Sequence, residues 1–248
     1  MPASPLPETA PSGAFRGAPP PGRCVMILGM HRSGTSMLAG TLRQAGLDLG
    51  RVYDTPFALN PTGLQEPEAL IHMHENLLEA NGGAWHDPPE RVVWGKLHRA
   101  VRDLFIESRA GRPLWGFKEP RTLLVAEGWI EALPDWTAVG IFRHPAEVAA
   151  SIAARNGFPL AQGLALWSAY NRRLLALHRT HGVPLVEFSA DPARMAAALA
   201  AVLARLELPT GAAAAVHDAA IPRHAAAALP PLPAVTAVLL AELRAASV

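Results

Sequence analysis

Several common features are scarce or missing in this chain of 248 residues. Its single cysteine, Cys24, cannot form a disulfide within the chain, which fits a reducing compartment. The net charge is only +1, so no broad basic field favours nucleic acid as a partner, and any anion site must be local. No stretch approaches the roughly 20 apolar residues that a membrane-spanning helix needs. We therefore expect a cytoplasmic protein without a transmembrane segment.

The two ends of the chain differ in composition from its middle. Residues 1–22 are rich in proline, alanine and glycine and lack the apolar core of a secretory signal, which predicts a disordered leader. Residues 23–208 are long enough to bury one sizeable core and predict a single domain. Residues 209–248 are rich in alanine and proline and predict a tail that is partly disordered or holds one amphipathic helix at 235–244.

Short apolar runs alternate with amphipathic segments along the predicted domain. The run at 24–28 (CVMIL) shows no alternation, as is typical of a strand buried on both faces. Further strands are expected at 114–117, 137–142 and 184–188, and helices at 35–45, 66–80, 92–108, 122–133, 146–155, 160–180 and 192–206. Parallel strands need crossover connections, which helices supply on both faces of the sheet. The pattern predicts an α/β class: a three-layer, P-loop-like fold with a short central parallel sheet flanked by helices.

The loop at residues 29–36 (GMHRSGTS) follows a predicted buried strand and opens a predicted helix. Glycines in such a loop let the backbone turn tightly and present N–H groups inward, and the helix N-terminus adds partial positive charge. The spacing G-x-x-x-x-G is that of a nucleotide-binding loop, but Thr35 stands where a Walker A loop has lysine. The strong cation of the loop is Arg32 instead. The loop predicts a phosphate-binding site and argues against a nucleoside triphosphatase.

A second cation, Arg143, ends the predicted strand at 137–142. Magnesium-dependent nucleoside triphosphatases place an acidic residue at the end of such a strand to hold the metal. An arginine there suits a second phosphate, because arginine forms charge-assisted and often bidentate bonds with phosphate oxygens. Ser151 follows eight residues later, two turns along the next predicted helix. We expect Arg143 and Ser151 to grip one phosphate from two sides.

These two elements together resemble the sulfotransferases that use 3′-phosphoadenosine 5′-phosphosulfate (PAPS). In that family, a loop of the form R/K-S-G-T-[ST] holds the 5′-phosphosulfate, and an arginine at a later strand end with a serine about eight residues on holds the 3′-phosphate. The resemblance implies a nucleotide site that also binds the product 3′,5′-ADP, made of Arg32, Ser33, Gly34, Thr35, Ser36, Arg143 and Ser151.

Three further motifs are similar to a bacterial branch of this family. They are N-x-x-G-x-x-E at residues 60–66, which ends in Glu66, K-E-P-R at 118–121 and R-H-P at 143–145. The resemblance covers residues 23–208. One departure is Glu119, where the branch usually has aspartate; the charge is kept on a longer arm.

The resemblance implies sulfuryl transfer to an acceptor hydroxyl or amine without a metal. Positioning and electrostatic stabilisation carry such a reaction, and a base must take the acceptor's proton. Arg32 and Lys118 are the candidate catalytic cations, and Glu66 is the first candidate for the base, with His31, His72 and Glu119 as alternatives. Trp167 and Tyr170 are expected to pack in the core or along the acceptor wall.

Two other functions stay open on the sequence. The first is a P-loop kinase or nucleoside triphosphatase, which would bind ATP in a magnesium-dependent way. The second is a catalytically silent nucleotide-binding module, which would bind 3′,5′-ADP without sulfuryl transfer. The acceptor is not encoded in a readable motif: a glycan, a lipid, a peptide and a small metabolite are all compatible with residues 48–108 as the lining of its pocket. The oligomeric state is equally open.

Overall fold

The computed structural model of the protein describes residues 19–55, 63–215 and 231–248. A four-stranded sheet forms its centre, with the order β2-β1-β3-β4 and every neighbouring pair parallel. The strands are β1 (Arg23–Leu28), β2 (Leu114–Lys118), β3 (Trp136–Phe142) and β4 (Leu185–Glu187). The predicted α/β class with a short parallel sheet is confirmed. Most of the predicted leader, and Asn60 to Thr62 of the first resembling motif, lie outside the described residues.

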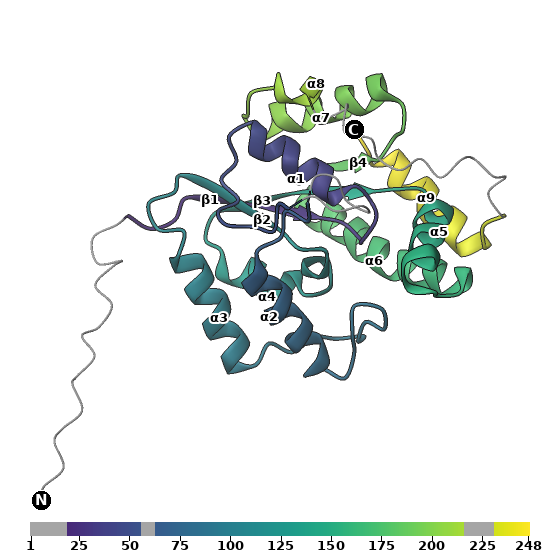
Figure 1. The fold of residues 1–248 in the computed structure, drawn as a ribbon, viewed down its shortest axis with the longest axis horizontal. Coiled ribbons are helices and arrows are strands. Elements are labelled where there is room, and N and C mark those ends of the chain that lie inside the picture. The colour runs from purple at the N-terminus through teal and green to yellow at the C-terminus, as the bar shows by residue number, and fades with distance from the viewer. Residues whose placement is uncertain (1–18, 56–62, 216–230) are drawn as a thin grey trace, which may run out of the picture.

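Helices cover both faces of the sheet (Figure 1). Successive side chains of a strand point to opposite faces, and in β1 Val25 and Ile27 pack on one side while Cys24, Met26 and Leu28 pack on the other. The first face is covered by α1 (Thr35–Gln44), α7 (Pro192–Arg205) and α8 (Ala212–Ala215). The second is covered by α2 (Glu68–Glu79), α3 (Lys96–Glu107), α4 (Ala126–Ala132), α5 (Pro145–Asn156) and α6 (Leu160–His181). All five residues of β1 that follow Arg23 are buried, as the unbroken apolar run predicts.

The helices expected at 92–108 and 122–133 differ from the observed elements. The helix expected at 92–108 begins only at Lys96, after an extended Gly95. The helix expected at 122–133 is instead a 3₁₀ turn, η2 (Pro120–Leu124), followed by α4. Val125 separates the two with a φ of −128°. Helical periodicity could not reveal this break, because a tertiary cluster around Glu119 holds the turn, as described below.

The helix expected at 66–80 begins at Glu68, so Glu66 lies just before it rather than in its first turn. Proline disfavours helical conformation in the residue that precedes it, and Pro67 follows Glu66 directly. Pro67 itself is extended, with φ −67° and ψ 127°. The backbone of Glu66 instead pairs with Tyr53, whose N–H donates to the Glu66 carbonyl at 2.9 Å.

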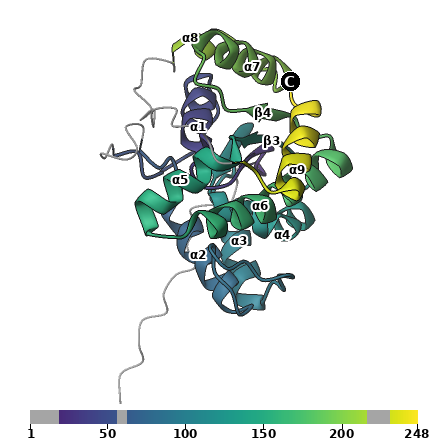
Figure 2. The same cartoon turned by 90° about the vertical axis from the view of Figure 1, so that its right-hand side faces the viewer.

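The last helix, α9 (Ala234–Ala245), is close to the helix expected at 235–244. It packs against α6 (Figure 2). Its residues Leu239, Leu240 and Leu243 are buried there. After it, Ser247 pairs with Leu185 of β4. Among the described residues, no helix has the length and apolarity to cross a membrane.

Candidate functional site

The loop between β1 and α1 curls tightly at the carboxyl end of the sheet. Gly34, the N-cap of α1, has a φ of 92°, and a Cβ atom there would lie 2.6 Å from the Phe188 ring. A Cβ atom at Gly29 would lie 2.5 Å from the carbonyl oxygen of Ile141. Arg32 takes the left-handed conformation, with a φ of 66°, which is uncommon for a residue with a side chain. The glycines thus let the loop lie against β3, beside the first turn of α1.

Polar groups of this loop suit an anion. No side chain caps the N-terminus of α1. Its first backbone N–H groups can therefore donate to an anion bound in the loop. The Ser33 hydroxyl is fully buried and has no hydrogen-bond partner among the described residues. Thr35 opens the helix and is buried, and Ser36 follows it. A buried hydroxyl without a partner is costly, and an anion bound in the loop is one group that could accept its hydrogen bond.

Arg32 reaches from the loop to α5. Its Nε donates to the Ser151 hydroxyl at 2.9 Å, between residues that are 119 positions apart in the chain. Ser151 is buried, on the helix that begins directly after Arg143 and His144. The glycine loop and the helix that carries Ser151, which were predicted as separate phosphate-binding elements, are therefore in contact.

Arg143 lies at the carboxyl end of β3, as expected. Its Nε donates to Glu147 at 2.6 Å, and its guanidinium lies 4.8 Å from the centroid of the Phe188 ring. The same ring borders Gly34, so Arg143 sits one aromatic ring away from the loop. The indole of Trp167 donates to the Arg143 carbonyl at 2.8 Å and fixes the end of the strand. Trp167 is thus a buried packing residue that also holds Arg143 in place.

Positive charge gathers between the loop and α5. Burial lowers the pKa of Arg32, and the positive charges of Arg155 and Arg143 lower it further. The charges of Arg143 and Arg155 are therefore near enough to act on Arg32. Arg155 was missed by the sequence analysis, although it lies four residues after Ser151 and hence on the same face of α5.

A second charged cluster lies at the carboxyl end of β2. The Lys118 ammonium donates to Glu66 at 2.6 Å and to the Ser36 hydroxyl at 3.2 Å. The side chains of Lys118 and Glu66 are only 1% and 9% exposed. Ser36 in turn donates to the Leu64 carbonyl at 3.0 Å. Lys118 thereby connects the predicted base to the first turn of the helix that follows the loop.

The environment of Glu66 raises its affinity for a proton. Burial raises the pKa of Glu66, the ammonium of Lys118 opposes that rise, and the negative charge of Glu119 adds to it. A buried carboxyl with a raised pKa and a lysine beside it is suited to accept a proton near neutral pH. This geometry sets Glu66 apart from the other candidates for the base.

Glu119 is already committed to other partners. It accepts hydrogen bonds from His74 at 2.6 Å and from the Arg121 guanidinium at 2.5 Å. Burial alone would raise the pKa of Glu119, but the hydrogen bond from His74 and the positive charge of Arg121 bring it below its usual value. His74 was missed by the sequence analysis; a histidine on the buried face of a helix carries no distinctive sequence signal.

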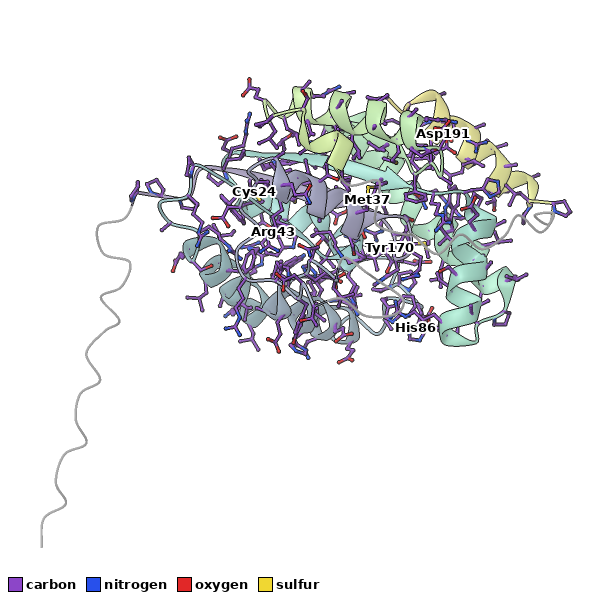
Figure 3. All side chains as sticks on the ribbon, turned by 45° about the horizontal axis from the view of Figure 1, so that its top comes forward. Cys24, Met37, Arg43, His86, Tyr170 and Asp191 are labelled. Atoms are coloured by element: carbon purple, nitrogen blue, oxygen red, sulfur yellow. The ribbon has the colours of Figure 1, made fainter. Side chains whose placement is uncertain are left out.

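The two histidine candidates differ in position. His72 is exposed on α2 and lies 3.9 Å from Glu68, away from the buried cluster. His31 lies in the loop, with ring centroids 4.8 Å from Trp85 and 6.2 Å from Tyr170. Burial lowers the pKa of His31 to about 3, so it is neutral at pH 7. The Tyr170 hydroxyl donates to the Trp85 carbonyl at 2.9 Å, and these rings continue from the buried Tyr170 to the exposed His86 (Figure 3).

The sequence matches no protein-family model and no curated protein. Among solved structures, the sulfotransferase domain of the olefin synthase from Synechococcus PCC 7002 aligns with a TM-score of 0.54 at 19% identity, covering 94% of this chain and 98% of that domain. The sulfotransferase STF1 from Mycobacterium tuberculosis H37Rv aligns with a TM-score of 0.48 at 14% identity, covering 90% of this chain and 77% of the other. The protein TT1252 from Thermus thermophilus aligns with a TM-score of 0.44 at 24% identity, covering 75% of this chain and 98% of the other.

The first of these likenesses extends over nearly the whole length of both chains, and at this low identity it speaks for the fold alone. Together with the parallel sheet and its flanking helices, it shows that this chain has a sulfotransferase fold.

Proposed function

We propose that the protein is a sulfotransferase that moves a sulfuryl group from PAPS to a hydroxyl or amine of an acceptor. The observation that carries this proposal is the 2.9 Å hydrogen bond from Arg32 to Ser151. It joins the loop after β1 to the helix after β3, which supports a single site made of the two predicted phosphate-binding elements. A fold-level likeness to sulfotransferases supports the same reading.

The residues present fit a ligand with two anionic ends. The backbone of the loop, the buried Ser33 hydroxyl and Arg32 suit the 5′-phosphosulfate, with Thr35 and Ser36 adding hydroxyl groups. Arg143 and Ser151 suit the 3′-phosphate. Burial lowers the pKa of Arg32, and repulsion from Arg155 and Arg143 lowers it further. A polyanion bound here would relieve that repulsion.

Bound PAPS would supply the sulfuryl group, whose bond to the departing phosphate oxygen breaks as the acceptor oxygen or nitrogen attacks sulfur. Arg32 and Lys118 stabilise the negative charge that grows on that phosphate and on the sulfuryl oxygens. Glu66 accepts the proton of the acceptor. The Lys118 ammonium, 2.6 Å from the Glu66 carboxyl, opposes the rise in pKa that burial causes and so favours the ionised form of the base.

A binding titration distinguishes the proposed sulfotransferase from a kinase or a nucleoside triphosphatase. The protein is titrated with 3′,5′-ADP, ADP and ATP, each with and without magnesium. We expect the tightest binding for 3′,5′-ADP and no need for magnesium. Tighter, magnesium-dependent binding of ATP would favour the kinase reading instead.

Transfer is tested with PAPS labelled in the sulfuryl group. A screen of hydroxyl-bearing glycans, lipids, peptides and small metabolites should yield at least one labelled product. Binding of 3′,5′-ADP without transfer to any acceptor in the screen would favour the silent binding module.

A further inference from the structure

The chain turns sharply at Glu119, Pro120 and Arg121, the elbow that follows Lys118. A buried row of polar side chains lies next to this elbow, and none of the roles above accounts for it. The Trp129 indole N–H donates to His74 Nε2 at 3.0 Å, and His74 Nδ1 lies 2.6 Å from Glu119 Oε2. An indole nitrogen can only donate, so His74 Nε2 must be the acceptor. The ring proton of the neutral histidine is therefore on Nδ1, from where it is donated to Glu119.

Three donors converge on the Glu119 carboxylate. Besides His74, the backbone N–H of Arg121 donates to Oε2 at 3.0 Å, and the Arg121 guanidinium donates to Oε1 at 2.5 Å. The guanidinium also donates to Glu75 at 2.6 Å. A carboxyl group surrounded by donors is held in its ionised form. Glu119 is fully buried, and a carboxylate in that position is stable only when it is hydrogen-bonded in this way.

The elbow links this carboxylate to Lys118. Glu119 follows Lys118 directly in the chain, and its side chain caps η2 by accepting from Arg121 N. The bonds to His74 on α2 and to Arg121 hold Glu119 from two sides. The direction in which β2 ends is thereby set, and with it the direction of the Lys118 side chain toward Glu66 and Ser36.

We propose that Trp129, His74 and Glu119 form a positioning relay that holds Lys118 against Glu66 and Ser36. In this arrangement His74 and Glu119 act on Lys118 through the backbone of the elbow. The importance of the relay for transfer rests on the proposed function, whereas its effect on Lys118 can be measured without any turnover.

The relay also sets the charge near the predicted base. The charged groups that act on Glu66 are Lys118, Glu119 and Arg121, from the end of β2 and from η2. The negative charge of Glu119 raises the pKa of Glu66, after burial and against Lys118. Replacing Glu119 by neutral glutamine removes this contribution and lowers the pKa of Glu66. The acidic limb of the pH–rate profile should therefore move to lower pH in Glu119→Gln.

The chain offers an unusually clean probe of Lys118, because its only other lysine is Lys96. Lys96 is exposed at the start of α3, whereas Lys118 is buried. Acetylation with acetic anhydride followed by mass spectrometry then reports two rates in one sample. In the wild type we expect Lys96 to react fast and Lys118 to be strongly protected.

His74→Phe keeps the ring shape and removes both hydrogen bonds, and Trp129→Phe removes only the indole donor. In His74→Phe the buried Glu119 carboxylate loses its histidine partner, so we expect acetylation of Lys118 to speed up by about ten-fold. The increase in Trp129→Phe should be smaller. His74→Asn, which keeps a donor near the position of Nδ1, should restore part of the protection. The acetylation rate at Lys96 should be the same in all variants. For the pH–rate profile of Glu119→Gln, the matched control is Glu79→Gln on the exposed face of α2.

Thermal unfolding of each variant identifies any that do not fold, and Trp129→Phe keeps the test open if His74→Phe is one of them. Wild-type protection of Lys118 in folded His74→Phe and Trp129→Phe overturns the relay. If Lys118 is released but kcat and its pH profile are those of the wild type, the relay has no role in transfer. If the wild type itself transfers no sulfuryl group, the proposed function fails, and the acetylation rates still decide whether the relay positions Lys118.

Discussion

The two strands that flank β1 end in opposite electrostatic settings. At the end of β2, Lys118 is buried and ion-paired with Glu66, while the neighbouring Arg121 is paired with Glu119 and Glu75. At the end of β3, Arg143 is paired with the more exposed Glu147 and lies near two further cations, Arg32 and Arg155. One end is close to charge balance, and the other carries excess positive charge.

This difference separates two tasks between the two strand ends. An excess of cations attracts a polyanion but does not define the protonation state of any group. A balanced buried cluster does the reverse: it holds each group in one charge state and one position, at the price of attracting little. We infer that the β3 end supplies nucleotide affinity and the β2 end supplies the chemistry. The variants below test that division.

The largest effect is expected at the balanced end. Glu66→Gln removes the proposed base and should lower kcat about 10²–10⁴-fold, while 3′,5′-ADP affinity changes little. Steady-state kinetics and calorimetric titration measure the two quantities. Glu68→Gln, two residues away and 63% exposed, is the matched control. An equal loss of turnover and affinity would make Glu66 structural.

The next effect is expected at the positive end and distinguishes its two arginines. Arg143→Ala should weaken 3′,5′-ADP binding about 10–100-fold, in keeping with charge-assisted bonds to phosphate, and leave 5′-AMP binding nearly unchanged. Arg32→Ala should weaken binding of both nucleotides. Titrations of each variant with both ligands give the comparison, and the exposed Arg194 supplies the control Arg194→Ala. If Arg143→Ala weakens both nucleotides equally, the assignment of the 3′-phosphate to Arg143 is wrong.

A smaller effect is expected at Arg155, which lies at the exposed end of α5. Arg155→Ala should weaken 3′,5′-ADP binding only about two- to five-fold, because an exposed charge is screened by water and salt. The difference from the wild type should shrink as salt is raised from low to physiological concentration. A loss that does not depend on salt would point to a structural effect on α5.

The last effect concerns stability instead of affinity and uses His31, whose pKa depends on charges at both strand ends. Burial lowers its pKa from 6.5 to about 3, the charge of Glu119 opposes this, and Arg121, Arg155 and Lys118 add to it. The unfolded chain therefore takes up a proton that the folded protein excludes. The free energy of unfolding should fall as pH drops from about 6.5, by up to about 1.4 kcal/mol per pH unit from this group.

His31→Gln should remove that contribution. Urea unfolding of the wild type and the variant between about pH 4.5 and 6.5 measures it, above the range in which most carboxylates titrate. The two plots of free energy against pH should differ in slope, with the variant flatter. Parallel plots would mean that His31 is as accessible to protons in the folded protein as in the unfolded chain.

The predicted architecture followed from local signals that the tertiary structure left intact. The unbroken apolar run of β1, the glycine loop and the start of α1 at Thr35 were all readable, because each depends on residues close together in the chain. The failures occur where distant residues intervene. Glu119 and its partners turn the expected helix at 122–133 into η2 and α4. The cytoplasmic location, the absence of nucleic-acid binding and the domain limits stay predictions.

The site divides in the same way. The sequence by itself determined which side chains could bind phosphate, because loop glycines, strand ends and the spacing from Arg143 to Ser151 are local properties. Only the tertiary structure decided that Arg32 meets Ser151, that Lys118 pairs with Glu66 across 52 positions, and that His74 holds Glu119. Such contacts depend on how the helices pack over the sheet, and hydrophobic periodicity specifies only which face of a helix is buried, not which polar group it meets there.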